Sequence, residues 1–557
     1  MSIDTQPSAR NDTSLMPASN QSKVRHYHAA QWREPLIFAL HAAGQRGVIP
    51  PSSNDIPDLE SGVGPEALVR RMDKVQLPEV SQPQVLRHFM RLSQETLGAD
   101  LNVDIGQGTC TMKYSPKINE RFVRSHKSAC LHPKQDASTA QGTLDLMWRL
   151  ERMIAEITGM DAVSLQPGAG SAAIYANVKI VQAFHQHRNE SAQRDEVITT
   201  IFSHPSNAAT ARTAGYRVIT LYPGAEGYPS IESLRAVLSE RTAALFITNP
   251  EDTGIFNPHM REFVDAVHEV GGLCVYDQAN ANGVLGVARA GEAGFDLGHL
   301  NLHKTFSTPH ACGGPAAGAV FATAKLEPFL PGPRIICEDG RFVVTDGGPL
   351  ATACIRPALG VTPNLVRAYA WIMALGAEGL REVANIAVLN NNYVMHRVSQ
   401  IPGVSVPYSP GTHRIEQVRY SWQEMLEATG ISSGDIGTRM ADFGFHYWTS
   451  HHPYVVPEPL TLEPTESYSR AELDEYMDAL AHVAEEARTD PDIVRTAPHR
   501  SSVHAINSQA ATDPNTWAPS WRAYRHKYLG EQAPVHARWT APNGLAAKPR
   551  PPKAFHR

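Results

Sequence analysis

The sequence has few cysteines and no pair of them in a CxxC spacing. Six cysteines are scattered over 557 residues, so we expect reduced thiols, with neither a disulfide framework nor a zinc ribbon. No apolar run approaches the roughly 18 residues of a membrane span. The opening stretch, MSIDTQPSARNDTSLMPASNQSK, lacks the apolar core of a secretory signal. These absences predict a cytoplasmic protein that does not enter a membrane.

A large excess of charge of one sign is also missing. The formal net charge is −6, which gives no general electrostatic case for binding nucleic acid. What the chain does have is core-forming material, because 42% of its residues are hydrophobic and 19% are charged, as in soluble globular proteins. A length of 557 residues is several times that of a typical domain, so we expect two or more domains.

Strand-like and helix-like segments alternate in the middle of the chain. Short β-rich runs such as EVITTIF (196–202) and GLCVYD (272–277) are separated by helical patterns such as PHMREFVDAVHEVGG (258–272). This alternation predicts βαβ units and a largely parallel sheet flanked by helices. From about residue 365 the helical patterns become longer, and a shorter mixed region follows. The sequence therefore predicts an α/β protein with a smaller C-terminal α+β domain.

Composition and pattern divide the chain into five parts. The N-terminal tail is rich in Ser, Asn, Gln and Pro, which predicts disorder, and the C-terminal tail is basic and contains several prolines. The predicted parts are a disordered tail (1–25), an N-terminal extension or arm (26–135), a large domain that contains the predicted sheet (136–365), a small C-terminal domain (366–505) and a C-terminal extension (506–557).

Three features in the predicted sheet domain fit one chemistry. Asp277 ends a predicted strand, where ligands bind in open α/β sheets. Lys304 follows 27 residues later, after a second strand-like run. A glycine-rich turn, LQPGAGSAA (165–173), precedes a helical pattern and can offer backbone N–H groups to a phosphate. Each feature alone is a weak signal. Together they supply what pyridoxal phosphate needs: a lysine for a Schiff base, an aspartate for the pyridine nitrogen and a phosphate cradle.

Longer motifs make the prediction specific. The segment VYDQANANGVLGVARAGEAGFDLGHLNLHKTFSTPHACGGPAAG (275–318) resembles the cofactor-lysine segment of the pyridoxal-phosphate-dependent glycine decarboxylases. This family is the P-protein of the glycine cleavage system, and the likeness is to the second subunit of its two-subunit bacterial form. WREPLIFAL (32–40), CTMKYSPKINERF (110–122) and EPLTLEPTES (458–467) resemble the same subunit in order, so the likeness covers roughly residues 26–505. It implies the aminotransferase-like fold, called fold type I, with a mostly parallel sheet of the seven-stranded type.

The resemblance also implies roles for individual residues. Lys304 matches the lysine that holds the cofactor, Asp277 the aspartate that pairs with the pyridine nitrogen, and His204 the histidine that stacks on the ring; these three are the predicted catalytic residues. Further residues predicted to bind the cofactor are Gly170, Ser171, Thr308 and His303. Residues predicted to lie near the substrate are Cys110, Thr111, Met112, Lys113, Tyr114, Asn249 and His310.

A metal site is the alternative use of the histidines near Lys304. His299 and His303 are four residues apart and His310 is close in sequence, so a helix could present two imidazoles to zinc. The stretch HLNLH, however, lacks the glutamate of the HExxH pattern, and its apolar alternation is typical of a strand. We therefore expect no metal.

Two functions remain open on these grounds. The first is glycine decarboxylation, with transfer of the aminomethyl group to lipoylated H-protein and with P-protein subunit 1 as partner in a dimer or heterotetramer. The second is a diverged enzyme of the same family that acts on another amino acid or an amine without the lipoyl carrier. It is suggested by departures from the family pattern close to the predicted cofactor site, which also predict a weakened reaction with glycine. These departures are Ile174, Gln278, Ala311 and Cys312.

Overall fold

The structure is a computed structural model that describes most of the chain. The described residues are 24–25, 27–49, 77–97, 100–308, 310, 314–356, 358–447, 455–502 and 513–530. All but the last two residues of the tail predicted to be disordered lie outside these ranges, as does the basic end of the C-terminal extension. Within them, no helix combines the length and the apolar character that crossing a membrane requires.

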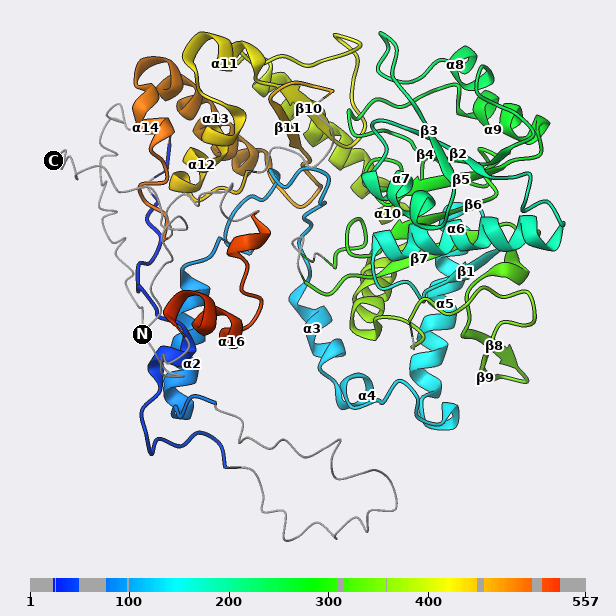
Figure 1. Ribbon diagram of the computed structural model, residues 1–557, viewed down its shortest axis with the longest axis horizontal. Coiled ribbons are helices and arrows are strands. Elements are labelled where there is room, and N and C mark those ends of the chain that lie inside the picture. The colour runs from blue at the N-terminus through cyan, green and yellow to red at the C-terminus, as the bar shows by residue number, and fades with distance from the viewer. Residues whose placement is uncertain are drawn as a thin grey trace, which may run out of the picture.

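A seven-stranded sheet forms the centre of the larger domain (Figure 1). Its strand order is β1-β7-β6-β5-β4-β2-β3. Strands β2 to β6 run parallel, and β7 is antiparallel to both of its neighbours. The prediction of a mostly parallel sheet is therefore confirmed. The strand bounds are β1 (Ala162–Ser164), β2 (Glu196–Thr200), β3 (Arg217–Leu221), β4 (Thr242–Thr248), β5 (Leu273–Gln278), β6 (Leu297–Asn301) and β7 (Gly318–Ala322).

Helices cover both faces of this sheet, and the strand sequences show why. In β4, Leu245 and Ile247 face one apolar cluster while Ala244 and Phe246 face another. A strand whose successive side chains are apolar in both directions must be buried on both sides. One face is covered by α6 (Gly170–His187) and α7 (Pro205–Thr213), and the other by α5 (Gln141–Thr158), α8 (Ile231–Arg235) and α9 (Met260–Glu269).

A long helix, α10 (Thr362–Val398), connects the two cores of the molecule. Its first half packs on the sheet domain through Leu365 and Trp371. It kinks at Gly376, whose φ of 64° favours a residue without a side chain. Its second half contributes Val394 and Val398 to the core of the smaller domain.

The smaller domain combines a two-stranded antiparallel sheet with helices (Figure 1). The strands are β10 (Val418–Ser421) and β11 (Pro459–Leu462), and the helices are α11 (Gln423–Thr429), α12 (Ser433–Met440), α13 (Arg470–Thr489) and α14 (Pro491–Arg495). A separate hairpin of β8 (Arg334–Glu338) and β9 (Arg341–Thr345) packs on α5 in the larger domain.

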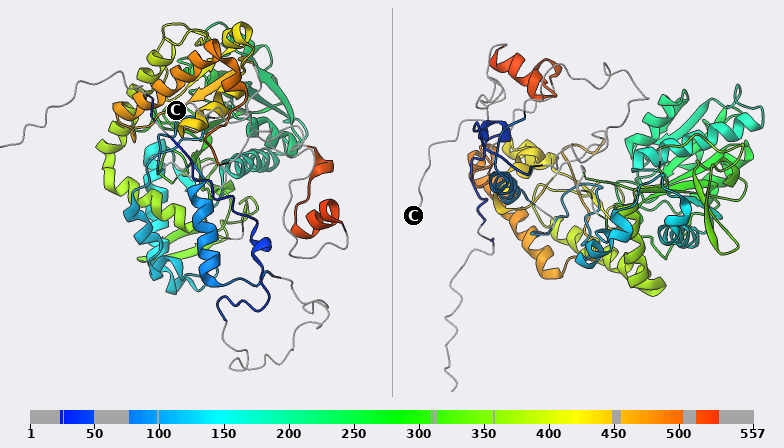
Figure 2. Two further views of the ribbon diagram at one scale, coloured as in Figure 1. Left: turned by 90° about the vertical axis from the view of Figure 1, so that its left-hand side faces the viewer. Right: turned by 90° about the horizontal axis from the view of Figure 1, so that it is seen from below.

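The N-terminal arm and part of the C-terminal extension lie together below the smaller domain (Figure 2). Phe38 stacks on Trp521 of α16 (Trp521–Tyr524), with ring centroids 4.9 Å apart. In the arm, α2 (Gln82–Gln94) is anchored where His88 meets the Glu34 carboxylate at 2.9 Å. The chain then enters the seam between the two domains at residues 103–113, which are mostly buried, and leaves it through α3 (Lys117–Val123) and α4 (His126–Ala129).

Candidate active site

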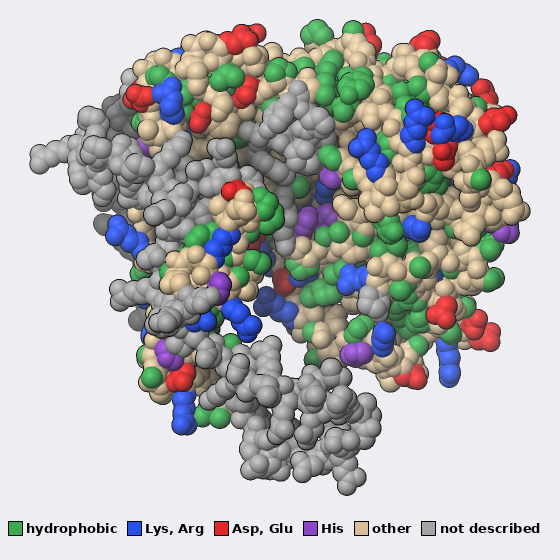
Figure 3. Space-filling view, in the orientation of Figure 1, with side chains coloured by type: hydrophobic (Ala, Val, Ile, Leu, Met, Phe, Trp, Pro, Cys, Tyr) green, Lys and Arg blue, Asp and Glu red, His purple; other side chains and the backbone are tan. Residues whose placement is uncertain are grey.

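The strand ends bring the predicted catalytic groups to one edge of the sheet. Asp277 is the second-last residue of β5, and it lies opposite His299 of the neighbouring strand β6. Lys304 follows three residues after β6 ends. Because β5 and β6 are parallel, their carboxyl ends meet at the same edge. In the space-filling view, a hollow with histidine side chains along its wall separates the two domains (Figure 3).

Asp277 is a buried carboxylate whose negative charge is stabilised by hydrogen bonds and nearby histidines. Asn207 donates a hydrogen bond to its Oδ2 at 2.8 Å, and the backbone N–H of Ala279 donates to Oδ1 at 3.1 Å. The His299 Nε2 atom is 3.5 Å from Oδ1. Burial raises the pKa of the Asp277 carboxyl, but His299, His204 and the hydrogen bonds outweigh it and hold the pKa below its usual value. The group is therefore a negative charge at neutral pH.

Lys304 is buried, and its amine lies near Glu416 and Glu463 without bonding to either. Its side chain is in a residue only 8% exposed, and the Nζ atom makes no hydrogen bond or ion pair with any residue that the structure describes. The loop that carries it is fixed by the Thr308 hydroxyl, which donates to the Leu302 carbonyl at 2.8 Å. A buried amine that is engaged in no hydrogen bond or salt bridge is available to form a covalent bond.

The other predicted cofactor residues surround these two. Gly170 begins α6, and a Cβ there would lie 2.6 Å from the Asn301 side chain, so only glycine allows this approach. Ser171 is exposed at the same end, and no side chain caps the first N–H groups of α6. His204 caps α7, its Nδ1 accepting from the N–H of Ser206 at 3.1 Å.

These groups fit pyridoxal phosphate. The uncapped start of α6 offers N–H donors and a positive dipole to a phosphate. The ionised Asp277 suits a protonated pyridine nitrogen, and Lys304 supplies the amine. No described group competes for the two most characteristic contacts, because the amine of Lys304 and the helix start both lack a protein partner.

His303 and His310 turn toward each other instead of toward a shared ligand position. Their rings meet edge to face with centroids 4.3 Å apart. The Nδ1 atom of His303 is 2.8 Å from the Ala317 carbonyl oxygen. Burial, followed by the nearby His310, lowers the pKa of His303 to about 3, so the ring is neutral. Its predicted contact with the cofactor stays a prediction.

The segment predicted to lie near the substrate is held between the two domains. The Thr111 hydroxyl is 2.5 Å from Glu463 Oε1, and Lys113 Nζ is 2.7 Å from Glu466 Oε2. On the other side, Ser307 in the lysine loop donates to the carbonyl of Tyr114 at 2.5 Å. Met112 is buried, Cys110 is half-buried and Tyr114 is exposed. Residues 111–114 therefore connect the smaller domain to the loop that carries Lys304.

The side chain of Asn249 is bonded within its own loop. Its Oδ1 accepts from the N–H of Asn257 at 2.8 Å, and its Nδ2 donates to the Asn257 carbonyl at 3.2 Å. Both ends of the amide are used to close its own loop, so its proximity to a substrate stays a prediction.

Sequence reasoning missed two buried acids in the seam, Glu416 and Glu463. Burial raises the pKa of Glu416 to about 7 and that of Glu463 to about 8. The nearby Lys304 lowers the pKa of both, against this trend. The one signal in the sequence is the motif EPTES (463–467), which contains Glu463 and resembles the family.

The departures from the family pattern do not all lie in the site. Ile174 is fully buried in the apolar layer between α6 and the sheet. It therefore gives no reason to expect a weaker reaction. Gln278 is buried beside Asp277, and its Oε1 has no hydrogen-bond partner among the described residues. Ala311 and Cys312 lie outside the described residues.

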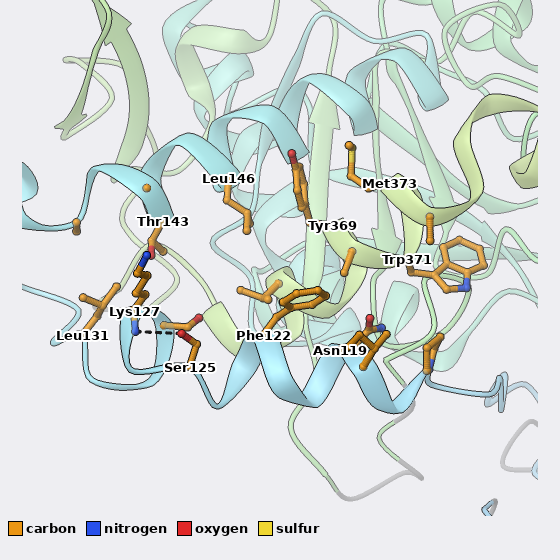
Figure 4. A pocket seen from close by; sticks show the side chains of 18 of the residues that line it. Asn119, Phe122, Ser125, Lys127, Leu131, Thr143, Leu146, Tyr369, Trp371 and Met373 are labelled. Atoms are coloured by element: carbon orange, nitrogen blue, oxygen red, sulfur yellow. Dashed lines mark hydrogen bonds between the residues drawn. The ribbon is translucent and has the colours of Figure 1, made fainter.

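A large apolar groove opens behind the seam. It has a volume of about 960 Å³, and Phe122 of α3, Leu146 of α5 and Tyr369 of α10 point into it (Figure 4). Ile118 and Met373 on its walls are 52% and 57% exposed. Trp371 lines the groove and also lies under Lys113, with Nζ 5.2 Å from the ring centroid.

Comparisons with known proteins agree with this geometry. Residues 52–340 match the family described as glycine cleavage system P-protein, and residues 383–500 match the family described as glycine dehydrogenase, C-terminal domain. A protein of Pyrococcus horikoshii named probable glycine dehydrogenase (decarboxylating) subunit 2 is 41% identical over 91% of this chain and 99% of its own length. A protein of Aeropyrum pernix with the same name is 36% identical over 91% of this chain and 100% of its own.

Solved structures share the fold. A crystal structure of glycine decarboxylase (P-protein) of the glycine cleavage system, in inhibitor-bound form, superposes with a TM-score of 0.62 at 18% identity, covering 77% of this chain and 94% of that one. A NifS-like protein gives a TM-score of 0.54 at 14% identity, covering 69% of this chain and 99% of that one. The predicted fold class is confirmed.

Proposed function

Because this chain belongs to the glycine cleavage system P-protein family, we propose that it is a pyridoxal-phosphate-dependent glycine decarboxylase and that it works in a glycine cleavage system. The observation that carries the proposal is that a buried lysine with no hydrogen bond or salt bridge among the described residues, Lys304, lies at the same edge of the sheet as the ionised Asp277. The relatives named for glycine do not favour the alternative of a diverged enzyme for another amino acid or amine.

Pyridoxal phosphate would be held by groups that the chain keeps free. Lys304 would bind it covalently, the start of α6 with Gly170 and Ser171 would take its phosphate, and Asp277 would face the pyridine nitrogen. Bound there, the cofactor would accept the electron pair that remains on the α-carbon when CO2 leaves. Asp277 would assist by staying negative, which keeps the pyridine nitrogen protonated.

The seam between the domains would keep water away from the reacting atoms. Thr111 and Lys113 are buried there by their contacts with Glu463 and Glu466. A dry site strengthens the interaction of Asp277 with a positive ring nitrogen, because the effective dielectric constant is lower than in water.

A partner subunit and a lipoylated H-protein complete the proposed reaction. The relatives are named subunit 2, which implies a subunit 1, and we propose that the two subunits assemble as a dimer or heterotetramer in the cytoplasm. The exposed apolar walls of the groove beside Trp371 support an assembly, because patches of this kind mark interaction surfaces. The H-protein would receive the aminomethyl group.

Borohydride reduction tests the cofactor assignment. The protein purified with pyridoxal phosphate should be labelled on Lys304 alone, as read by peptide mapping. Exchange of labelled bicarbonate into glycine, with subunit 1 and H-protein supplied, tests the reaction. A label on another lysine would refute the site, and a correctly labelled enzyme without exchange would refute the reaction.

A further inference from the structure

Four polar side chains from distant parts of the chain meet beside Lys304. Asn280 donates to Glu463 Oε1 at 2.6 Å, and the Thr111 hydroxyl is 2.5 Å from the same oxygen. On its other side, Asn280 Oδ1 lies 3.3 Å from the hydroxyl of Thr305, the residue next to Lys304. Glu463 thus joins the smaller domain to the substrate-side loop and to the lysine loop.

The hydrogen bonds fix the orientation of the Asn280 amide next to Glu463. The backbone N–H of Asn282 donates to Asn280 Oδ1 at 3.1 Å. A backbone N–H is always a donor, so the amide group of Asn280 that faces Glu463 is its NH2. Glu463 Oε1 therefore accepts from Asn280. The Thr111 hydroxyl lies 2.5 Å from Glu463 Oε1 and 3.1 Å from Asn280 Oδ1, so it can donate to either oxygen, and a proton on the carboxyl can lie on Oε2 or on Oε1 pointing to Thr111. The Oε2 atom is buried and has no hydrogen-bond partner in the described part of the chain.

The charges that face Glu463 make a buried carboxylate costly. Glu416 is a second buried acid close by, with one oxygen bound to the N–H of Gly283 at 2.9 Å. Lys304 is the nearby positive group for both acids. The charge of Lys113 also reaches them, but Glu466 already neutralises it at 2.7 Å. Two carboxylates this close in a buried site would repel each other, so ionisation of one makes ionisation of the other more costly.

We propose that Glu463 is a positioning residue of the active site, which holds Thr111 and Asn280 beside Lys304 as an uncharged carboxylic acid. Loss of its proton places a second negative charge next to Glu416 and loosens the seam around the bound amino acid. Glycine binding therefore weakens as the pH rises through the alkaline range. The choice of glycine as ligand rests on the proposed function; the protonation of Glu463 does not.

Replacing Glu463 by glutamine keeps an uncharged side chain of the same shape but removes its ability to ionise. In Glu463→Gln the amide oxygen can still accept from Thr111 and Asn280, and the NH2 takes the place of Oε2. Glu463→Leu removes both the accepting oxygen and the polar group at the Oε2 position. The matched control is Glu151→Gln, because Glu151 of α5 is also buried, and its pKa is likewise raised by burial to about 8, but it makes no contact with the seam residues.

The measurement is the glycine dissociation constant of the holoenzyme, from the change in the cofactor absorption spectrum, between pH 7 and pH 9.5. For wild type and Glu151→Gln, the constant should rise above pH 8, approaching about tenfold per pH unit. For Glu463→Gln it should match wild type at pH 7 and lose most of this rise. For Glu463→Leu it should be raised on the order of 10- to 100-fold at every pH.

Two results would overturn the proposal. One is loss of glycine binding at pH 7 in a folded Glu463→Gln, which would mean that the charged form is needed. The other is a dissociation constant for glycine that still rises above pH 8 in that variant as it does in wild type; this rise is called the alkaline limb below. If Glu463→Gln does not fold, Thr111→Val serves instead: weaker glycine binding with the alkaline limb kept supports the proposal, and binding equal to wild type refutes it. A wild-type holoenzyme that ignores glycine at every pH is a different failure, since it refutes the proposed function and the inference with it.

Discussion

Two buried lysines lie on either side of the seam, and they differ in whether an acid forms a salt bridge with them. Lys113 is 2% exposed and is neutralised by Glu466 at 2.7 Å, with the face of Trp371 beneath it. Lys304 is 8% exposed and meets no hydrogen-bonding or ionic partner among the described residues. Burying an unpaired amine costs stability, and a fold accepts such a cost mainly where the group has chemistry to perform.

The buried acids at the sheet edge and in the seam differ as well. Asp277, near Lys304, keeps its charge because hydrogen bonds and two histidines support it. Among the described residues, Glu463 in the seam has only neutral donors on one oxygen and none on the other. The contrast indicates that the sheet edge is built to present charges to a ligand, whereas the seam uses pairs and neutral groups to join the two domains.

The sharpest test of this contrast is Lys304→Met. Turnover should fall by at least about ten-thousandfold, because the covalent link to the cofactor is lost. The apoprotein should nevertheless keep most of its stability, since no hydrogen bond or salt bridge among the described residues is broken and only the attraction of Lys304 for Glu416 and Glu463 is lost. Urea denaturation of both apoproteins measures this, and a marked loss of stability would mean that Lys304 has a structural partner after all.

Asp277→Asn tests whether the supported charge matters for the reaction. The amide keeps the shape but removes the charge that favours a protonated pyridine nitrogen. We expect turnover to fall on the order of 10²- to 10³-fold, with folding retained. Cofactor absorption and glycine exchange, compared at equal cofactor occupancy, give the answer. Near-normal exchange would remove Asp277 from its proposed role.

Lys113→Met should behave as the reverse of Lys304→Met. It leaves the mostly buried Glu466 without its cation, so unfolding free energy should fall by about 3 kcal/mol, at the lower end for a broken buried pair because Glu466 retains some exposure. The double variant Lys113→Met, Glu466→Leu should recover most of the loss. If the single variant is as stable as wild type, the two lysines do not differ as described.

How much of the fold and the site the sequence could predict depends on how far apart along the chain the contacting residues are. Asp277 and Lys304 were predictable because each lies at the end of its own short strand pattern, and parallel neighbours bring such ends together. The contact between Thr111 and Glu463 joins residues 352 positions apart, and no local pattern predicts the packing of one domain on the other. Ile174 shows the converse error, because closeness in sequence to the phosphate turn suggested a pocket residue, whereas helical periodicity turns it into the core.

The smallest effect concerns Glu151, which tests whether an unpaired buried acid is peculiar to the seam. It is buried in α5, its Oε2 has no partner in the described part of the chain, and burial raises its pKa to about 8. A carboxyl whose folded pKa is raised binds more protons in the folded state than in the unfolded state. The stability that it contributes is complete below the unfolded pKa, about 4.5, and is lost as the pH rises through the folded value.

Glu151→Gln removes this dependence. Between pH 6 and pH 7 the unfolding free energy of the variant should gain about 1.4 kcal/mol relative to wild type, from one group that no longer has to lose its proton. Urea denaturation of the two proteins at both pH values measures the difference, while glycine binding should stay that of wild type. Equal slopes for the two proteins would show that Glu151 is already ionised in the folded state. Burial without a partner would then not be enough to keep a carboxyl neutral here, and the neutrality inferred for Glu463 would have to come from its neighbour Glu416.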